Sequence, residues 1–250
     1  MEGNGIAGWL ERSELLIGTE ALRNLQNAHV LLVGLGGVGS FAGEFLVRAG
    51  IGEMTIIDGD VVDPTNKNRQ LQALNSTVGK SKVQLLKERY LDINPDIKLH
   101  CIDHFMLPDD MENLLRNNTY DFILDCIDSI QPKLNLIQLA RASRMKFISS
   151  MGAGGKLDPT AIRIRDISQT KECKFARTVK KLLKRRGIRD RILVVYSEEI
   201  QPKEALKMTD GAKYKKSYYG TISYMPALFG LFMASEVIRR LADLKKKKLH

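Results

Sequence analysis

The chain has 250 residues, a formal net charge of +10 at pH 7 and three cysteines. This length can bury a substantial core in one large domain, or in one domain with a small addition. Cys101, Cys126 and Cys173 form no C-x-x-C pair, which argues against a disulfide framework and a structural zinc site and favours the reducing cytoplasm. The basic charge suits a polyanionic partner such as nucleic acid, although it can also serve solubility alone.

The first 28 residues are predicted to form a helical lead-in, because leucines recur among polar neighbours between residues 9 and 27. Arg12 stands out within it. On a helix surface this residue would be only a solvated charge, whereas ahead of a nucleotide-binding fold its guanidinium has the length and geometry to reach a phosphate. The first residues show no basic-then-apolar secretion signal, so we expect this segment to stay on the protein.

The next stretch has the pattern of a βαβ nucleotide-binding unit. An apolar strand over residues 30–33 leads into the sequence GLGGVG at residues 34–39, and a helical segment follows to residue 49. A second apolar strand over residues 54–57 then ends at Asp58. This order of strand, glycine loop, helix and strand predicts that a nucleotide binds at the loop.

Each residue of this unit has a physical task. Gly34 permits the tight turn, Gly36 lets a phosphate approach the backbone, and Gly39 lets the helix lie close to the strand with its N-terminal N–H groups facing the anion. Asp58 stands at a strand end, where its carboxylate can accept hydrogen bonds from ribose hydroxyls. The alternative is a glycine-rich turn without a ligand.

Residues 59–82 form a polar segment that is long for a simple connection, and such segments beside a binding strand are commonly functional. Asn66 and Arg69 within it have side chains that suit phosphates. Lys82 opens the next helix, which is expected to run to residue 93. Because the helix dipole disfavours a lysine at this end, Lys82 indicates a bound anion, and the alternative is an ordinary surface lysine.

The alternation of strands and helices continues to residue 150. Strands are predicted over residues 97–102, 120–125 and 146–150, and helices over residues 109–117 and 130–144. This order predicts an α/β fold with a Rossmann-like, doubly wound, mostly parallel sheet, in which residues 29–155 form the nucleotide-binding domain.

Two acidic residues follow the strand over residues 120–125, where an open parallel sheet has its active-site crevice. Asp125 is interpreted as a cap of the helix that begins near Ser129. Asp128 is interpreted as a magnesium ligand, because a carboxylate facing the phosphates of a nucleotide is repelled unless a divalent cation lies between them.

Residues 156–250 are predicted to form a C-terminal α/β extension that packs with the rest as one compact unit. Before it, the glycines of residues 152–155 permit tight backbone packing or close approach to a ligand. We expect strands over residues 161–165, 192–196 and 199–201, a mobile loop over 203–217, and an apolar helix within 218–244 that serves the core or a dimer interface. The most apolar part of this helix is too short to span a bilayer.

Residues 172–186 are predicted to form an amphipathic helix. Its inward residues are Phe175, Val179, Leu182 and Leu183, and its outward residues are Lys174, Arg177, Lys181, Lys184 and Arg185. Ten lysines or arginines against two acidic residues fall between residues 171 and 191. Such a face is usually only solvated, but this asymmetry also suits a nucleic acid. The lysines at 245–248 allow the same two interpretations.

The combination of motifs resembles the ubiquitin-activating-enzyme-like superfamily. The segments that carry this resemblance are GLGGVGS, IDGDVVDPTNKNRQ, VGKSK and DCIDS. Within the superfamily, RSELLIG, NRQ, DCIDSIQPK, GAGGKLDPT and GTISYMP are similar to the branch of tRNA threonylcarbamoyladenosine dehydratases. The resemblance covers residues 12–241, which is nearly the whole chain.

This resemblance implies a set of site residues. ATP would be bound by Gly34, Gly36, Gly37, Gly39, Asp58, Asp60, Asn66, Arg69, Lys82, Asp128 and Ser129. Magnesium would be bound by Asp128. The catalytic residues would be Arg12, Arg69, Lys82 and Asp128, with Arg12 acting as a finger contributed across the interface of a homodimer.

The implied reaction begins with activation of a carboxylate at the α-phosphate of ATP. In the tRNA branch this carboxylate belongs to threonylcarbamoyladenosine beside the anticodon, and attack by a tethered nitrogen or oxygen then closes a ring with loss of water. A sulfur-relay or carrier protein is a further partner that the superfamily suggests.

Three rival functions share some of these sequence features. The first is an adenylyltransferase that activates the C-terminus of a ubiquitin-like sulfur-carrier protein, and the lack of paired zinc-binding cysteines and the basic charge speak against it. The second is a nicotinamide-dependent dehydrogenase, which Asp128, Arg69 and Lys82 suit less well than they suit a triphosphate with a metal. The third is a non-catalytic RNA-binding module, which would have no use for an ATP cluster.

Overall fold

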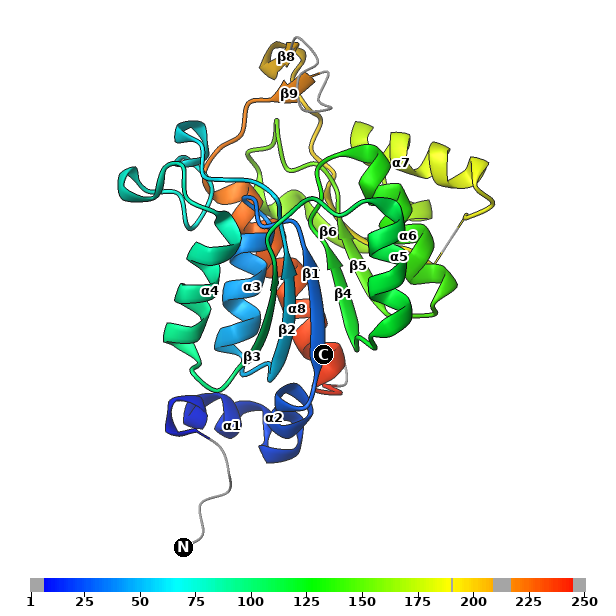
Figure 1. The fold of residues 1–250 in the computed structure, drawn as a ribbon. Helices are drawn as coiled ribbons and strands as arrows, with labels where there is room; N and C mark the ends of the chain where they lie inside the picture. The colour runs from blue at the N-terminus through cyan, green and yellow to red at the C-terminus, as the bar shows by residue number, and fades with distance from the viewer. Residues whose placement is uncertain (1–6, 190, 209–216, 245–250) are drawn as a thin grey trace, which may run out of the picture.

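The computed structural model describes residues 7–189, 191–208 and 217–244, and its centre is a seven-stranded sheet (Figure 1). The strands are β1 (His29–Val33), β2 (Glu53–Ile57), β3 (Lys98–Ile102), β4 (Phe122–Asp125), β5 (Phe147–Ser150), β6 (Ile162–Asp166) and β7 (Leu193–Ser197). Their order across the sheet is β3-β2-β1-β4-β5-β7-β6, and all neighbours pair in parallel except β6, which is antiparallel to β7. The predicted Rossmann-like, mostly parallel α/β fold is confirmed.

Helices cover both faces of this sheet. They are α1 (Glu11–Ile17), α2 (Thr19–Gln26), α3 (Gly39–Arg48), α4 (Lys82–Ile93), α5 (Pro108–Asn117), α6 (Ile130–Ala142), α7 (Lys174–Arg185) and α8 (Tyr224–Leu241). Single turns of 3₁₀ helix lie at Gly8–Leu10, Pro64–Asn66, Asn75–Thr77, Pro159–Ala161, Ile167–Gln169 and Lys203–Ala205. One face is packed by α3, α4 and α8 and the other by α5, α6 and α7, while α1 and α2 lie below the amino-terminal edge (Figure 1).

The sequence of β1 explains why both faces are covered. Val30 and Leu32 point into one apolar cluster and Leu31 and Val33 into the other, and none of the four is more than 6% exposed. Burying one such side chain contributes about 1.5 to 3 kcal/mol. A central strand that is apolar on both faces is therefore held rigidly, and the loop that follows it starts from a fixed point.

The apolar helix α8 is a core helix. Met225, Phe229 and Met233 on it are fully buried, and a Cβ at Gly230 would overlap the carbonyl oxygen of Val38, so that the glycine lets α8 lie directly against the start of α3. Of the two predicted uses of this segment, the core is confirmed. In the described part of the chain, no helix has both the length and the apolar character needed to cross a membrane.

Three predicted elements differ from the structure. The lead-in helix is broken into α1 and α2 at Gly18, which has a φ of 88°. The strand predicted over residues 199–201 is wrong, because Gln201 donates its side-chain amide to the carbonyl oxygen of Gly154 (2.6 Å) and the segment has no ladder. Within the predicted loop, β8 (Leu206–Met208) and β9 (Ser217–Tyr219) pair as an antiparallel hairpin. The centre of that loop and the lysines at 245–248 lie outside the described residues.

Candidate functional site

The glycine loop after β1 is shaped by close backbone contacts. Gly34 has a φ of 92°, and a Cβ there would lie 2.9 Å from the carbonyl oxygen of Cys126. A Cβ at Gly39 would overlap the carbonyl oxygen of Gly34. Only glycine fits at these two positions, and together they join the loop to the β4–α6 connection and set α3 close to the sheet.

Gly36 has different surroundings. A Cβ at this position would meet only the amide nitrogen of Gln70, at 3.8 Å, so the backbone here borders open space. Gly37 instead lies under Arg69, because its Cβ would be 3.0 Å from the Arg69 carbonyl oxygen. The loop thus has an open side at Gly36, at the start of α3, and this is the place where a phosphate would meet backbone N–H groups.

Asp58 links the glycine loop to the end of β2. Its Oδ2 accepts a hydrogen bond from the backbone N–H of Leu35 (2.6 Å), and its Oδ1 accepts one from Asp60 (2.8 Å). Burial raises the pKa of this carboxyl, against the opposing effects of the Lys82 ammonium and the two N–H donors. A carboxylate oxygen can accept more than one hydrogen bond, so Asp58 can also receive ribose hydroxyls.

Lys82 is paired with a carboxylate. Its side chain is 5% exposed, and its Nζ lies 2.9 Å from Oδ2 of Asp60. A lysine at the start of a helix needs an anion nearby, and here the Asp60 carboxylate of the same chain is that anion. The structure brings Lys82 together with Asp58 and Asp60 at the end of β2.

Arg69 and Asp128 interact electrostatically above the carboxyl ends of β1 and β4. Burial lowers the pKa of Arg69, and the charge of Asp128 opposes that effect. Arg69 donates to the carbonyl oxygen of Thr65 and to Oδ1 of Asn68, both at 2.9 Å. Asp128 accepts from the hydroxyl of Ser129 (3.3 Å), which precedes α6. Arg69 and Asp128 are therefore close enough to interact electrostatically, although they come from two separate loops.

Asn66 supports the loop that carries Arg69. It is 8% exposed, and its Oδ1 accepts a hydrogen bond from the backbone N–H of Asp63 (3.1 Å) in a capping box. This contact fixes the turn at Pro64–Asn66. Its predicted contact with phosphates stays a prediction.

Arg12 lies far from the other predicted site residues. It is exposed on α1, which packs at the amino-terminal edge of the sheet, where a Cβ at Gly50 would lie 3.0 Å from a methyl group of Leu10. The glycine loop is at the opposite, carboxyl edge (Figure 1). Within one chain, the fold does not bring Arg12 to the site.

The interpretation of Asp125 as a helix cap is wrong. Its Oδ2 lies 2.7 Å from Nζ of Lys133 and accepts a hydrogen bond from the hydroxyl of Ser149 (2.6 Å), and Lys133 and Ser149 are both fully buried. Its Oδ1 accepts from the backbone N–H of Ile127 (3.1 Å). Asp125 is thus the anion of a buried ion pair that shapes the loop leading to Asp128.

Sequence reasoning missed Lys133. One signal was available: a lysine stands directly before Leu134 on a helix whose neighbouring positions are apolar, so a charge on the buried face needed a partner. Asp125, which ends the apolar strand just before this helix, was an acidic candidate for that partner.

The β8–β9 hairpin packs on the glycine segment that follows β5. A Cβ at Gly154 or at Gly155 would lie 3.0 Å from Tyr219, and the side-chain amide of Asn68 donates to the carbonyl oxygen of Thr221 (2.9 Å). Of the two predicted uses of these glycines, tight packing is what the structure shows. The described ends of the hairpin stand above the carboxyl edge of the sheet (Figure 1).

The amphipathic pattern of α7 is confirmed. Val179 and Leu183 are at most 1% exposed, and the five basic side chains predicted to face outward are classed as exposed. At its first turn, Lys174 donates to the hydroxyl of Tyr219 (3.2 Å), which joins the basic face of α7 to the hairpin.

Comparison with known proteins shows the family of this chain. A model of the ThiF family matches residues 10–250. The chain belongs to the ThiF family. A relative from Bacillus subtilis, named tRNA threonylcarbamoyladenosine dehydratase, is 38% identical over 95% of this chain and 96% of its own length.

Solved structures of this ThiF-family fold bear the same name. A crystal structure of Escherichia coli tRNA N6-threonylcarbamoyladenosine dehydratase in complex with AMP has a TM-score of 0.83 at 32% identity and covers 95% of this chain and 96% of that one. The same enzyme in complex with ATP has a TM-score of 0.84 at 31% identity, with equal coverage. The family resemblance seen in the sequence is therefore confirmed.

Proposed function

We propose that this chain is an ATP-dependent dehydratase that activates the carboxylate of threonylcarbamoyladenosine beside the anticodon of tRNA and closes it into a ring. The names of its near full-length relatives support this reading, as do the E. coli structures with AMP and ATP. One observation of this structure carries it: the open glycine loop, Asp58 and the Arg69–Asp128 pair meet at one edge of the sheet.

ATP is the first substrate, and the site fits it. The open space at Gly36 admits phosphates to the start of α3, and Asp58 has acceptor capacity for the ribose. Arg69 and Lys82 would supply positive charge to the phosphates, with Asn66 fixing the turn that precedes Arg69. Binding of the triphosphate would draw Lys82 from Asp60 toward phosphate oxygens, because a phosphate carries more charge than one carboxylate.

Magnesium also fits the donors that are present. The carboxylate of Asp128 would hold it, in the way that Mg²⁺ is commonly bound by one or two carboxylates together with substrate phosphates and water. When bound, the ion would neutralise phosphate charge. Asp128 would then contact the phosphates through the ion, while the guanidinium of Arg69 would contact them directly.

The first chemical step joins the substrate carboxylate to the α-phosphate. A carboxylate oxygen attacks phosphorus, the bond to the β-phosphate oxygen breaks, and pyrophosphate leaves with the electron pair. The transition state gathers negative charge, which pre-placed cations such as Arg69 and Lys82 stabilise without reorganisation. Loss of one such group commonly costs about 3 to 4 kcal/mol of barrier.

The second step closes the ring. A nitrogen or oxygen of the same modification attacks the activated carbonyl carbon, and AMP leaves with the former carboxylate oxygen. The net change in the nucleoside is loss of one water. Because the nucleophile is already tethered to the electrophile, proximity supplies much of the acceleration and no enzyme thiol is required.

A homodimer would complete the site. Arg12 is on α1, which lies at the edge of the sheet opposite the glycine loop, so its proposed action on phosphate charge requires a second copy of the chain that presents its own α1 to this site. A symmetric pair would exchange two such fingers, one for each site. The three cysteines are free, which suits a cytoplasmic enzyme.

The tRNA would lie along the basic face of α7. This face is joined to the β8–β9 hairpin through Lys174 and Tyr219, and the hairpin is joined through Asn68 to the loop of Arg69. A polyanion on α7 could thus extend to the adenylation site over a continuous protein surface.

Incubation with ATP, Mg²⁺ and tRNA that carries the precursor modification tests the proposal. We expect AMP, pyrophosphate and a nucleoside lighter by one water. The rival carrier-protein adenylyltransferase is tested in parallel with a ubiquitin-like protein ending in Gly-Gly. Pyrophosphate exchange with that protein and none with the tRNA would reject our proposal in favour of the rival, which could also involve a sulfur-relay partner.

A further inference from the structure

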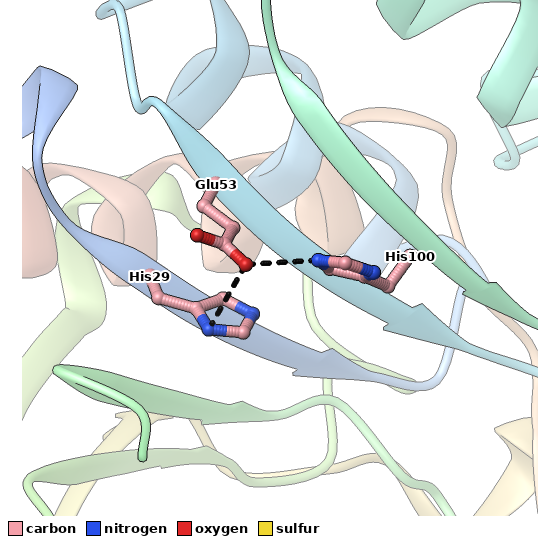
Figure 2. A group of neighbouring side chains, drawn as sticks. All are labelled: His29, Glu53 and His100. Carbon is pink, nitrogen blue, oxygen red and sulfur yellow. Dashed lines mark hydrogen bonds and ion pairs between the residues drawn. The ribbon is translucent and has the colours of Figure 1, made fainter. Parts of the chain in front are cut away.

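A second cluster of metal-ligating side chains lies at the amino-terminal edge of the sheet, away from the adenylation site. His29 begins β1, Glu53 begins β2 and His100 lies in the middle of β3 (Figure 2). The three are the group of His, Cys, Asp or Glu side chains in the described residues whose ligand atoms could surround one metal ion, and these atoms all lie within 4.8 Å of one another.

The register of the sheet creates this cluster. His29 is opposite Glu53 in the β1–β2 ladder, and His100 is opposite Thr55 in the β2–β3 ladder. Residues opposite one another in a parallel sheet, and residues two apart on one strand, share a face. Three adjacent strands therefore direct all three side chains to the same side, toward one point (Figure 2).

The three side chains already contact one another, and an ion would replace the direct contact between His100 and Glu53. Nε2 of His100 lies 2.8 Å and Nδ1 of His29 lies 3.6 Å from the same carboxylate oxygen of Glu53. Metal–ligand bonds of about 2.0 to 2.2 Å would place an ion among these three atoms after small side-chain rotations. The side chain of Glu53 is 30% exposed and that of His100 is 55% exposed, so an ion can enter from solvent.

The surroundings of His29 pre-set its orientation. Its Nε2 is 2.9 Å from the hydroxyl of Thr55, and the Tyr120 ring meets the imidazole edge-on, with ring centroids 4.6 Å apart. When Nε2 donates to Thr55, the lone pair of Nδ1 faces Glu53. A metal-ligating histidine usually has such a partner on its other nitrogen, which fixes both the tautomer and the ring orientation.

We propose that His29, Glu53 and His100 bind one divalent transition-metal ion, with Zn²⁺ as the preferred occupant. Two imidazoles and one carboxylate are a ligand set that zinc takes in proteins, with water in the fourth position. The ion would link β1, β2 and β3 near the edge of the sheet opposite the glycine loop. This site is independent of the proposed adenylation chemistry and of the magnesium proposed for that site.

One neighbour opposes the ion. Lys98 is opposite Glu53 in the β2–β3 ladder, and its ammonium interacts with the Glu53 carboxylate. Asp121 accepts a hydrogen bond from the backbone N–H of His29 (2.8 Å), and it adds negative charge near the imidazole of His29. Removal of the Lys98 charge should therefore tighten zinc binding, whereas removal of a ligand should weaken it.

The test is a zinc titration of the full chain, purified without a metal-binding tag and freed of metal with a chelator. It is done without ATP, Mg²⁺ or tRNA, in competition with a chromophoric chelator. We expect one Zn²⁺ per chain, at least about tenfold weaker binding for His100→Ala and Glu53→Gln, and tighter binding for Lys98→Gln. His104→Ala removes an exposed histidine four residues from His100 and should bind zinc like the wild type.

Two further measurements exclude the possibility that a variant loses zinc binding only because it is unfolded. Thr55→Val keeps the side-chain shape but removes the partner of His29 Nε2, and it should weaken zinc binding by about ten- to a hundredfold. Circular dichroism must show that each variant is folded. If a change at His29 or Thr55 disturbs the fold, His100→Ala still tests the proposal, because the His100 side chain is exposed. Absence of zinc binding by the wild type, or equal binding by His100→Ala, would overturn the proposal.

Discussion

Nζ of Lys133 lies 2.7 Å from Oδ2 of Asp125, and neither side chain is more than 1% exposed. The pair is completed by the hydroxyl of Ser149, which contacts both charged groups. It lies directly behind the loop to Asp128, because Asp125 also accepts the backbone N–H of Ile127. A buried ion pair of this kind is costly to break, since the remaining charge has no water around it.

Lys133→Met should therefore lower the free energy of unfolding by about 3 to 5 kcal/mol, as measured by chemical denaturation. The double variant Lys133→Met, Asp125→Asn should recover part of this loss, because no uncompensated buried charge is left. Lys87→Met, at an exposed lysine of α4, is the control and should change stability by less than about 0.5 kcal/mol. If the single and double variants are equally unstable, the cost is not that of a buried charge.

The glycine loop gives a prediction that separates binding from folding. Gly36→Ala places a methyl group in open space, where the nearest atom is 3.8 Å away, so the fold should be retained. The same methyl group lies where a phosphate would approach, and we expect at least about tenfold weaker ATP binding by calorimetry, a loss of about 1.4 kcal/mol. Gly8→Ala, whose Cβ would meet no atom within 4 Å, is the control. Unchanged ATP affinity in Gly36→Ala would place the phosphates elsewhere.

Local sequence patterns were enough to predict the nucleotide unit. The continuous apolar run of β1, the glycine spacing and the acid at the end of β2 are all short-range features of the sequence, and each is where the pattern put it. The partner of Asp125 was not predicted, because Lys133 looks like one more polar residue unless the buried face of α6 is known. Likewise, the cluster of His29, Glu53 and His100 depends on the register of three strands, which no local pattern reveals.

Arg12 shows a different limit of sequence reasoning. Its motif could be identified, but its place depends on how the chain packs. Arg12 is on α1, and this helix lies at the sheet edge opposite the loop that Arg12 was expected to serve (Figure 1). Only an assembly of two chains can reconcile that position with a role at the phosphates.

Glu44 predicts how stability depends on pH. Burial raises the pKa of this carboxyl, but hydrogen bonds and ion pairs with Arg89 and Arg48 outweigh it, so the pKa in the folded state lies below its ordinary value. A depressed carboxyl pKa stabilises the fold above the unfolded-state pKa of about 4.3, and this contribution is lost as the pH falls through the folded-state pKa.

We therefore expect Glu44→Gln to be less stable than the wild type at about pH 7, with the difference shrinking as the pH falls below about 4.3. Denaturant melts of both proteins across this range measure it. Glu88→Gln, at an exposed position of α4, should show no comparable pH-dependent difference. A gap between wild type and Glu44→Gln that stays constant down to low pH would show that the ionised form is not favoured by folding.

The basic face of α7 predicts a salt-dependent interaction with tRNA. Lys181→Glu reverses one exposed charge at the centre of this face, and it should weaken tRNA binding and reduce the slope of log affinity against log salt by about one. Lys87→Glu makes the same change on α4, on the other face of the sheet, and should leave both quantities near those of the wild type. Equal effects of the two variants would mean that only net charge matters and that α7 is not the binding face.

The assignment of Arg12 to a neighbouring subunit is tested by complementation. Arg12→Ala and Asp128→Ala should each abolish AMP formation with modified tRNA while leaving the fold intact, because Arg12 is exposed on α1 and Asp128 is exposed at the carboxyl edge. If each site takes Arg12 from one chain and Asp128 from the other, a mixed dimer has one site with both residues intact.

Random exchange of subunits at equal concentrations makes half of the dimers mixed, so turnover should recover to about a quarter of the wild-type value. The control mixes the single variant Arg12→Ala with the double variant that carries both Arg12→Ala and Asp128→Ala. In this mixture no chain has Arg12, so no site can have both residues intact. Recovery in the first mixture alone would require Arg12 to act across the interface. No recovery, with subunit exchange verified by mass spectrometry of differently tagged chains, would reject the finger in trans, since the far edge of the sheet leaves Arg12 no route to its own site.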